Sequence, residues 1–173
     1  PEAAACSITF GAPSKTFNIA GIVSSYAIVP SAELRERFFG WLHANEMNAA
    51  PLFSPIATIA AFRDGEEWRQ QMLKYVEGNI DWLCGFCAEN IPQIRPLKPQ
   101  ASFLVWLDCR SLGLGHDELV DLFVNKARLV LNDGETFNPG GQGFMRLNVA
   151  VPRSVLREAM ERLCEAYSLA LRS

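Results

Sequence analysis

The sequence predicts a mixed α/β fold, more narrowly α+β, in which several strands are covered by helices. Short apolar runs with strand character are interspersed with longer segments whose apolar residues recur every three or four positions. Prolines and glycines separate these segments, and no internal repeat or low-complexity linker is present. The 173 residues are enough for one domain with a sizeable core. We place a boundary near residue 30, between the end of one domain and a compact second one.

The first thirty residues contain two strand patterns on either side of a turn. Residues 6–10 and about 22–29 are the expected strands, and residues 11–18 form the turn between them. Pro1 and the residues after it lead directly into the first strand, so we expect no helix before it. This opening is typical of the middle of a longer protein.

Three helical patterns follow. Ser31 is a suitable N-cap for a helix that carries Leu34, Phe38 and Leu42 on one face. Residues 51–62 are apolar and rich in alanine, which predicts a buried helix. The longest helix is expected over residues 66–90. Its apolar stripe is Trp68, Met72, Val76, Ile80, Leu83 and Cys87.

The second half of the chain alternates between strand and helix patterns. Three prolines make residues 91–99 an extended connection, and the apolar run 103–107 suits a strand buried on both faces. A helix is expected over 117–127, with Leu119, Val120, Phe123 and Val124 inward. A short strand, 129–131, then leads into a turn at 132–134. After a glycine cluster at 139–143, we expect a strand at 144–149 and a helix from Arg153 to about Leu171. The inward face of that helix is expected to be Val155, Leu156, Ala159, Met160, Leu163 and Tyr167, with Glu158 and Arg162 paired outside.

Composition argues against several classes of partner. The net charge is −3 and no block of lysine or arginine occurs, so neither nucleic acid nor a membrane surface is an expected partner. No signal peptide or membrane-spanning run is evident, which favours a cytoplasmic location. Five cysteines in irregular positions do not suggest a disulfide framework. Cys84 and Cys87 have CxxC spacing, but they lie near the end of a helix, where buried structural thiols are expected. No second pair completes a metal site.

Lys15 is the first candidate for chemistry. It lies in the turn 11–18, between the first strand and the small residues 19–21. A lysine held at a strand exit among small and hydroxyl residues can lose its hydration and act as a neutral amine. Schiff-base chemistry with an aldehyde cofactor requires such an amine. On spacing alone, a solvated surface charge is the more common explanation of a lysine in a polar turn.

Arg146 is the second candidate. Strand alternation places it on one face with Phe144 and Asn148, beside the glycine-rich loop 139–143. Its planar guanidinium is suited to bidentate pairing with a carboxylate. Taken alone, a surface arginine at a sheet edge is the simpler explanation. The glycine-rich loop lacks the lysine and the following helix of a P-loop, which argues against a phosphate cradle.

Four stretches, in this order and spacing, carry a resemblance to a known family. They are residues 12–21 (APSKTFNIAG), 106–110 (WLDCR), 131–137 (beginning LNDG) and 143–148 (GFMRLN, followed by Pro152-Arg153). Together they resemble the C-terminal part of fold-type I pyridoxal 5'-phosphate (PLP) enzymes of the class I/II aminotransferase superfamily. The closest branch is the cystathionine β-lyase-like C–S lyases. The resemblance covers essentially the whole chain and implies a small, mostly antiparallel sheet packed with helices.

The resemblance also implies domains and residue roles. Residues 1–30 would be the C-terminal remnant of the large PLP-binding domain, and residues 31–173 the small C-terminal domain. Lys15 would form the Schiff base with PLP and then act as general base at the substrate Cα. Ser14 would donate a hydrogen bond to the cofactor phosphate. Arg146 would bind the α-carboxylate of the substrate.

The activity implied is that of a PLP-dependent C–S β-lyase. β-Elimination from cystathionine or another cysteine conjugate would give a thiol, pyruvate and ammonia. The substrate would be an amino acid, no metal is implied, and the full-length enzyme would be a homodimer. Two alternatives stay open: a PLP-dependent aminotransferase of the same superfamily, and a non-catalytic α/β interaction module that keeps the motifs by descent.

The sequence departs from the family pattern in two respects. Ala12 stands where family members carry a serine or threonine three residues before the lysine, which predicts a weaker grip on the phosphate or one supplied elsewhere. The family residues that stack on the PLP ring and pair with its nitrogen precede the lysine, and the chain has no counterpart of that region. We therefore expect a C-terminal fragment with little or no lyase activity by itself.

Overall fold

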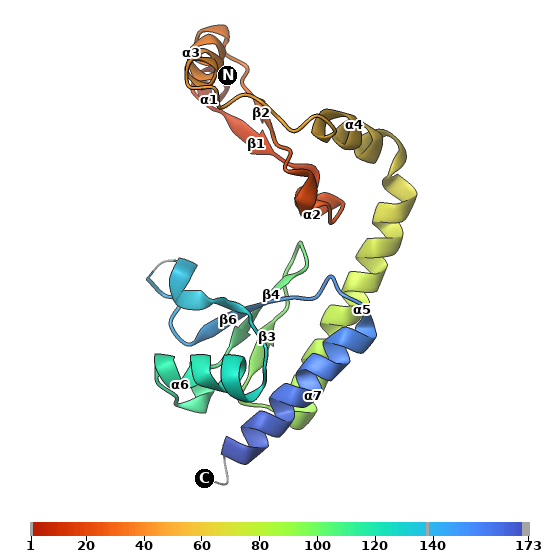
Figure 1. Cartoon of the computed structure of the whole chain (residues 1–173), viewed down its shortest axis with the longest axis vertical. Coiled ribbons are helices and arrows are strands. Elements are labelled where there is room, and N and C mark those ends of the chain that lie inside the picture. Colours follow the sequence, from red (N-terminus) through yellow and green to blue (C-terminus); the bar gives the residue numbers. More distant parts are fainter. Residues whose placement is uncertain (1, 138, 171–173) are drawn as a thin grey trace. The chain divides into compact units, whose positions relative to one another are not determined.

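The structure, a computed structural model, describes residues 2–137 and 139–170 (Figure 1). Two compact units are present, Pro1–Gln71 and Met72–Ser173, and the division falls inside one long helix. This division is not the domain boundary that the sequence predicts near residue 30, and that boundary stays a prediction. None of the helices in the described ranges has the length and apolar character that a membrane crossing requires.

The first unit consists of short strands and helices. Its elements are α1 (Glu2–Ala5), β1 (Thr9–Gly11), α2 (Pro13–Thr16), the 3-10 turn η1 (Ala20–Ile22), β2 (Tyr26–Ile28), α3 (Ala32–Ala44), α4 (Ser54–Asp64) and the start of α5 (Glu66–Asn90).

Strand β1 pairs antiparallel with β2, and Phe10 lies opposite Ala27. Two expectations for this region are wrong. A short helix, α1, precedes the first strand, and its alanines are good helix formers. Each strand is only three residues long, because pairing is confined to Thr9–Gly11 and Tyr26–Ile28.

Helices α3 and α4 differ in how well the sequence predicts them. The hydroxyl oxygen of Ser31 accepts a 3.3 Å hydrogen bond from the backbone N–H of Leu34, which confirms the predicted N-cap of α3. The expected burial of α4 is wrong, because Ile56 and Ile59 are 65% and 60% exposed. Apolar composition alone did not distinguish a buried helix from one with an open apolar face.

The second unit is a four-stranded sheet with helices. Its elements are the rest of α5, β3 (Arg95–Leu97), β4 (Leu104–Asp108), η2 (Arg110–Leu112), α6 (His116–Asp121), the π-helical turn η3 (Leu122–Lys126), β5 (Asn132–Asp133), η4 (Gly134–Phe137), β6 (Phe144–Asn148) and α7 (Arg153–Ala170).

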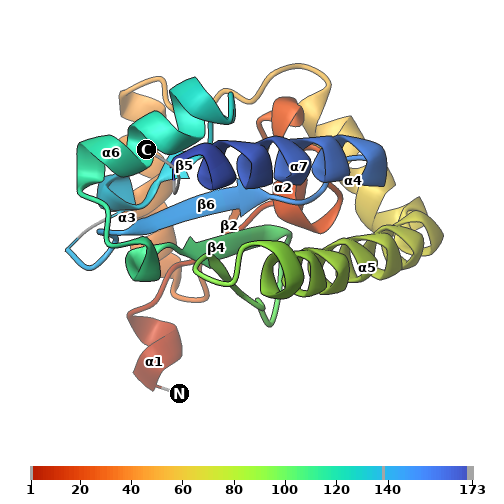
Figure 2. The same cartoon turned by 90° about the horizontal axis from the view of Figure 1, so that it is seen from below.

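The strand order is β3-β4-β6-β5, and every neighbouring pair is antiparallel, as the family resemblance implied. Helices α5 and α7 run alongside each other (Figures 1 and 2). The core contains the inward residues of β4 and β6 and the apolar stripes of the two helices: Val105, Leu107, Met145, Leu147, Val76, Ile80, Leu83, Cys87, Leu156, Met160 and Leu163.

Three local expectations in this unit need correction. The π-helical turn at Leu122–Lys126 changes the helical register, so Leu122 is buried and Val124 is exposed. The strand expected at 129–131 is replaced by β5 at Asn132–Asp133, the residues expected to form a turn. Val155 is 51% exposed and does not belong to the inward face of α7.

Candidate functional site

Lys15 lies in α2, the four-residue helix that follows β1 in the first unit. Two buried residues flank it in this short helical segment: Pro13 at the start and Phe17 at the C-cap. The backbone N–H of Phe17 donates to the carbonyl oxygen of Pro13 at 2.9 Å, and the Phe17 ring packs edge-on against Phe62 with 5.2 Å between centroids. These contacts fix the backbone that carries Lys15.

The side chains of Lys15 and Ser14 are available to a ligand. Lys15 is exposed and Ser14 is half-buried. Within residues 2–137 and 139–170, neither the Lys15 Nζ nor the Ser14 Oγ has a hydrogen-bond partner or an ion-pair partner. The described residues thus leave the Lys15 amine exposed to solvent and accessible to a ligand.

Arg146 lies on β6, on the face of the sheet away from the core. Its β6 neighbours Met145 and Leu147 are buried on the core face, as strand alternation predicted. Across the sheet Arg146 stands opposite Trp106 of β4 on one side and Asn132 of β5 on the other. The sheet therefore presents Arg146 between an aromatic and an amide side chain.

Two contacts orient the guanidinium of Arg146. Its Nη2 donates a 3.0 Å hydrogen bond to Oδ1 of Asn132. Its Cζ lies 4.2 Å from the centre of the Phe137 ring, within the range of a cation–π contact. The Phe137 ring in turn packs edge-on against Trp106, with centroids 5.3 Å apart. The guanidinium is half-buried and held from two directions.

The Nε nitrogen of Arg146 has no partner among the described residues. Its Nε is buried and makes no hydrogen bond to the described residues, and the side chain forms no ion pair within them. A buried guanidinium N–H without an acceptor is costly, and such groups are usually satisfied by a ligand or by water. Nε and a terminal nitrogen together form the edge that a carboxylate binds in a bidentate pair.

Asn132 and Phe137 are the site residues that the sequence argument did not assign. Both lie in the stretch 131–137, which the family resemblance marked without giving its residues a role. Strand pairing brings Asn132 beside Arg146, although the two are fourteen residues apart. This pairing was not predictable, because β5 is two residues long and begins with a typical turn sequence.

Asp108, in the marked stretch 106–110, has a structural role. It accepts hydrogen bonds from Arg110 (Nε at 2.9 Å, Nη2 at 2.8 Å) and from Arg95 (3.0 Å). The pKa of Asp108 lies well below its usual range, mainly because Arg110 donates hydrogen bonds to its carboxylate. Arg110 also lies over the Phe144 ring, 4.8 Å from its centre. The cluster fixes the ends of β4 and β6.

The CxxC cysteines have the structural character expected of them. Cys87 is fully buried, and burial raises the pKa of its thiol to about 12. Burial also raises the pKa of Cys84. Both are free thiols.

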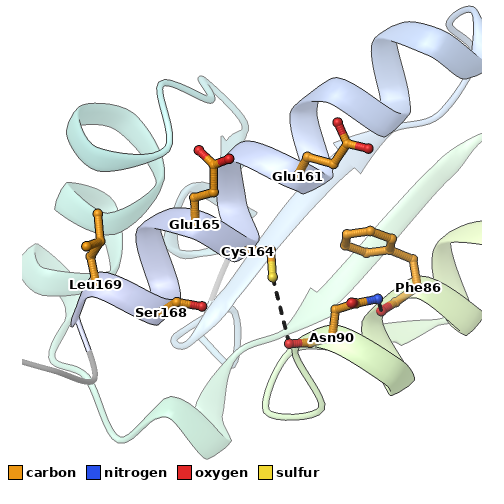
Figure 3. Close-up of a pocket in the computed structure, with 7 residues that line it drawn as sticks. All are labelled: Phe86, Asn90, Glu161, Cys164, Glu165, Ser168 and Leu169. Atoms are coloured by element: carbon orange, nitrogen blue, oxygen red, sulfur yellow. Dashed lines mark hydrogen bonds between the residues drawn. The ribbon is translucent and has the colours of Figure 1, made fainter.

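A separate cavity of about 640 Å³ lies between α5 and α7 (Figure 3). Cys164 lines it, and its Sγ contacts the carbonyl oxygen of Asn90 at 3.9 Å. None of the residues singled out from the sequence as Schiff-base lysine, phosphate ligand or carboxylate ligand lines this cavity.

Comparison with known proteins identifies the family. No protein-family model matches the chain. The chain is 36% identical, over 162 residues, to cystathionine beta-lyase PatB of Bacillus subtilis, covering 94% of this chain and 42% of that protein. It is 28% identical, over 154 residues, to an aspartate aminotransferase of Pyrococcus horikoshii, covering 88% of this chain and 39% of that protein.

A solved structure gives the same result. Cystalysin from Treponema denticola, which contains a PLP cofactor, superposes with a TM-score of 0.92 at 32% identity, over 96% of this chain and 42% of that one. The chain thus spans about two-fifths of the length of the relatives it matches. The relatives that the chain resembles include cystathionine β-lyases and C–S lyases, and the chain corresponds to the C-terminal part of such an enzyme. The sequence, the fold and these relatives thus agree that the chain belongs to the fold-type I PLP-dependent aminotransferase superfamily.

Proposed function

We propose that this chain carries the cofactor lysine, Lys15, and the substrate-carboxylate arginine, Arg146, of a PLP-dependent C–S β-lyase. The observation that carries the proposal is the guanidinium of Arg146, which Asn132 and Phe137 orient while its buried Nε has no acceptor among the described residues. The similarity to a cystathionine β-lyase supports the substrate class, a cysteine conjugate such as cystathionine.

The residues present fit PLP. Lys15 offers a primary amine for the aldehyde of the cofactor, and Ser14 offers a hydroxyl beside it for a phosphate oxygen. Both groups are without partners within the described residues, so neither has to break a contact. Bound PLP supplies the electron sink for the carbanion chemistry, which protein side chains do not provide.

Lys15 has two tasks in this proposal. Its Nζ would hold the cofactor through its aldehyde. As a free amine, the same Nζ would take the proton from the substrate Cα. The exposure of Lys15 within this chain leaves its Nζ accessible for the first task.

Arg146 orients the substrate. A bidentate pair between its guanidinium edge and the α-carboxylate would hold both carboxylate oxygens and, through them, the carboxylate carbon that is bonded to Cα. Arg146 would thereby fix the orientation of the substrate Cα and so select which of its bonds reacts. A lysine at this position would retain the charge but not the planar fork.

An aminotransferase is the second candidate, and the similarity to an aspartate aminotransferase supports it. In a lyase the thiol leaves from Cβ and the carbon skeleton ends as pyruvate. In an aminotransferase the amino group passes to a keto acid instead. The two activities are distinguished by whether product formation needs an acceptor.

The experiment uses an enzyme of the relatives' length that contains this chain, because the chain spans 42% of the Bacillus subtilis relative. Pyruvate formed from cystathionine with no keto acid added supports the lyase, and strict dependence on an acceptor contradicts it. Loss of activity in Lys15→Ala, with activity retained in the control Lys74→Ala on the exposed side of α5, supports the role of Lys15. We expect little or no activity from the chain alone. The cytoplasmic location and the homodimer also stay predictions.

A further inference from the structure

His116, the first residue of α6, lies between two carboxylates. Its Nε2 is 3.3 Å from Oδ2 of Asp133, and its Nδ1 is 3.3 Å from Oε1 of Glu135. The two acidic residues contact opposite ring nitrogens, so they do not converge on one point with the imidazole. No group of three such side chains in the described residues is arranged to hold a metal ion. The contacts thus tie α6 to the segment that contains Asp133 and Glu135.

That segment, residues 132–137, is hydrogen-bonded within itself. Oδ1 of Asp133 accepts a 3.0 Å bond from the backbone N–H of Glu135, and the hydroxyl of Thr136 donates to the Asp133 carbonyl oxygen at 2.6 Å. A displacement of Asp133 or Glu135 therefore moves the whole segment. Its two ends carry Asn132 and Phe137, the two residues that orient Arg146.

The segment is otherwise attached through β5, through Gly134 and through the Phe137 ring, which packs against Trp106. Strand β5 contributes only two residue pairs to the sheet. Gly134 is buried in close contact with Gly141, and the rest of the 132–137 segment is exposed or half-buried. The contacts of His116 attach its middle to a helix whose residues Leu119 and Leu122, within and just after α6, belong to the core. The helix thereby supports the middle of the segment, where Asp133 is half-buried and Glu135 is exposed.

We propose that His116 is a positioning residue for Arg146: it holds the 132–137 segment in place, and the segment holds the guanidinium that binds the substrate carboxylate. The proposal concerns the geometry of Arg146 and rests on the proposed function only for its effect on substrate binding. The charged residues next to His116 on α6 itself are Asp117 and Glu118. The Glu118 carboxylate accepts a hydrogen bond from the backbone N–H of Gly115.

The first test measures Arg146 directly in this chain by NMR, through hydrogen exchange of its Nε–H. We expect faster exchange in His116→Ala, by up to about tenfold, because loss of its two contacts lets the segment move and exposes the buried Nε–H to water. Glu135→Gln removes a single contact at a more exposed position, so it keeps the fold even if His116→Ala does not, and we expect a smaller change in the same direction. His116→Arg can donate to both carboxylates and is expected to restore slow exchange. The matched control is His43→Ala, which removes the other, exposed histidine.

The second test uses an active enzyme that contains the chain. If Arg146 binds substrate, His116→Ala raises KM for the amino acid by up to about tenfold with kcat little changed, because binding is weakened before and during the reaction alike. Unchanged Nε–H exchange in both His116→Ala and Glu135→Gln would overturn the proposal. Altered exchange with unchanged KM would instead support the positioning of Arg146 and contradict its role as carboxylate ligand.

Discussion

Nε of Arg153 donates a 2.6 Å hydrogen bond to Oδ1 of Asn79, which joins the start of α7 to the middle of α5. Asn79 is fully buried, and its Nδ2 donates to the carbonyl oxygens of Val149 (2.8 Å) and Val151 (3.0 Å). The Asn79 side chain thus supplies hydrogen bonds to the backbone carbonyl oxygens between the end of β6 and the start of α7. The orientation of β6, and of Arg146 on it, depends on this connection.

Replacing Asn79 should therefore destabilise the second unit. Asn79→Leu leaves two carbonyl oxygens and the Arg153 guanidinium without their partner, and each unsatisfied buried group costs about 1–3 kcal/mol. Denaturant unfolding followed by circular dichroism should show a loss in the free energy of unfolding of at least about 2 kcal/mol. The control is Asn90→Ala, which removes an exposed amide bonded within its own helix and should change stability by less than about 0.5 kcal/mol. Equal effects of the two substitutions would contradict this role for Asn79.

The pKa of Asp108 predicts a dependence of stability on pH. Because its pKa is lowered in the folded state, Asp108 contributes stability above the ordinary carboxyl pKa of about 3.9, and this contribution is lost as pH falls toward the folded value. Asp108→Asn should thus cost about 1–3 kcal/mol at pH 7, and the difference from wild type should shrink below about pH 4. Urea unfolding of both proteins from pH 7 to pH 3 measures this difference. Asp81→Asn, which removes an exposed carboxylate paired with Lys98, is the control with little effect.

The cysteines should differ in reactivity. The thiolate is the reactive form, and burial raises the pKa of Cys87 and of Cys109 to about 12, so few thiolates are present there at neutral pH. We expect iodoacetamide at pH 8 to modify the exposed Cys6 rapidly and to spare Cys87 and Cys109 until the chain is unfolded. Peptide mass spectrometry over time measures the order. Fast modification of Cys87 in the folded chain would contradict its burial.

The sequence was most informative where the structure depends on a local pattern. The apolar stripe that ends at Cys87 predicted α5, and the alternation around Arg146 predicted β6 and its buried face. The hydroxyl of Ser31 predicted the start of α3. In each of these cases neighbours within a few residues determine the geometry.

The sequence was less informative where distant residues decide. Strand β5 forms at Asn132 because β6 pairs with it. Leu122 is buried because a π-helical turn shifts the helical register, and the spacing of apolar residues does not reveal such a turn. The same limit applies to the site. Arg146 was found from its strand and its motif, but its partner Phe137 is brought to it by the fold of the 132–137 segment.

The proposed function depends on Lys15 as the residue that holds PLP. The most direct measurement is borohydride reduction of a PLP-loaded enzyme that contains this chain, followed by mass spectrometry of its peptides. Borohydride fixes the cofactor to the nitrogen that carries it, so we predict a pyridoxyl group on the peptide containing Lys15 and its disappearance in Lys15→Ala. Attachment to Lys74, Lys98 or Lys126, to a lysine outside this chain, or to none, would contradict the account.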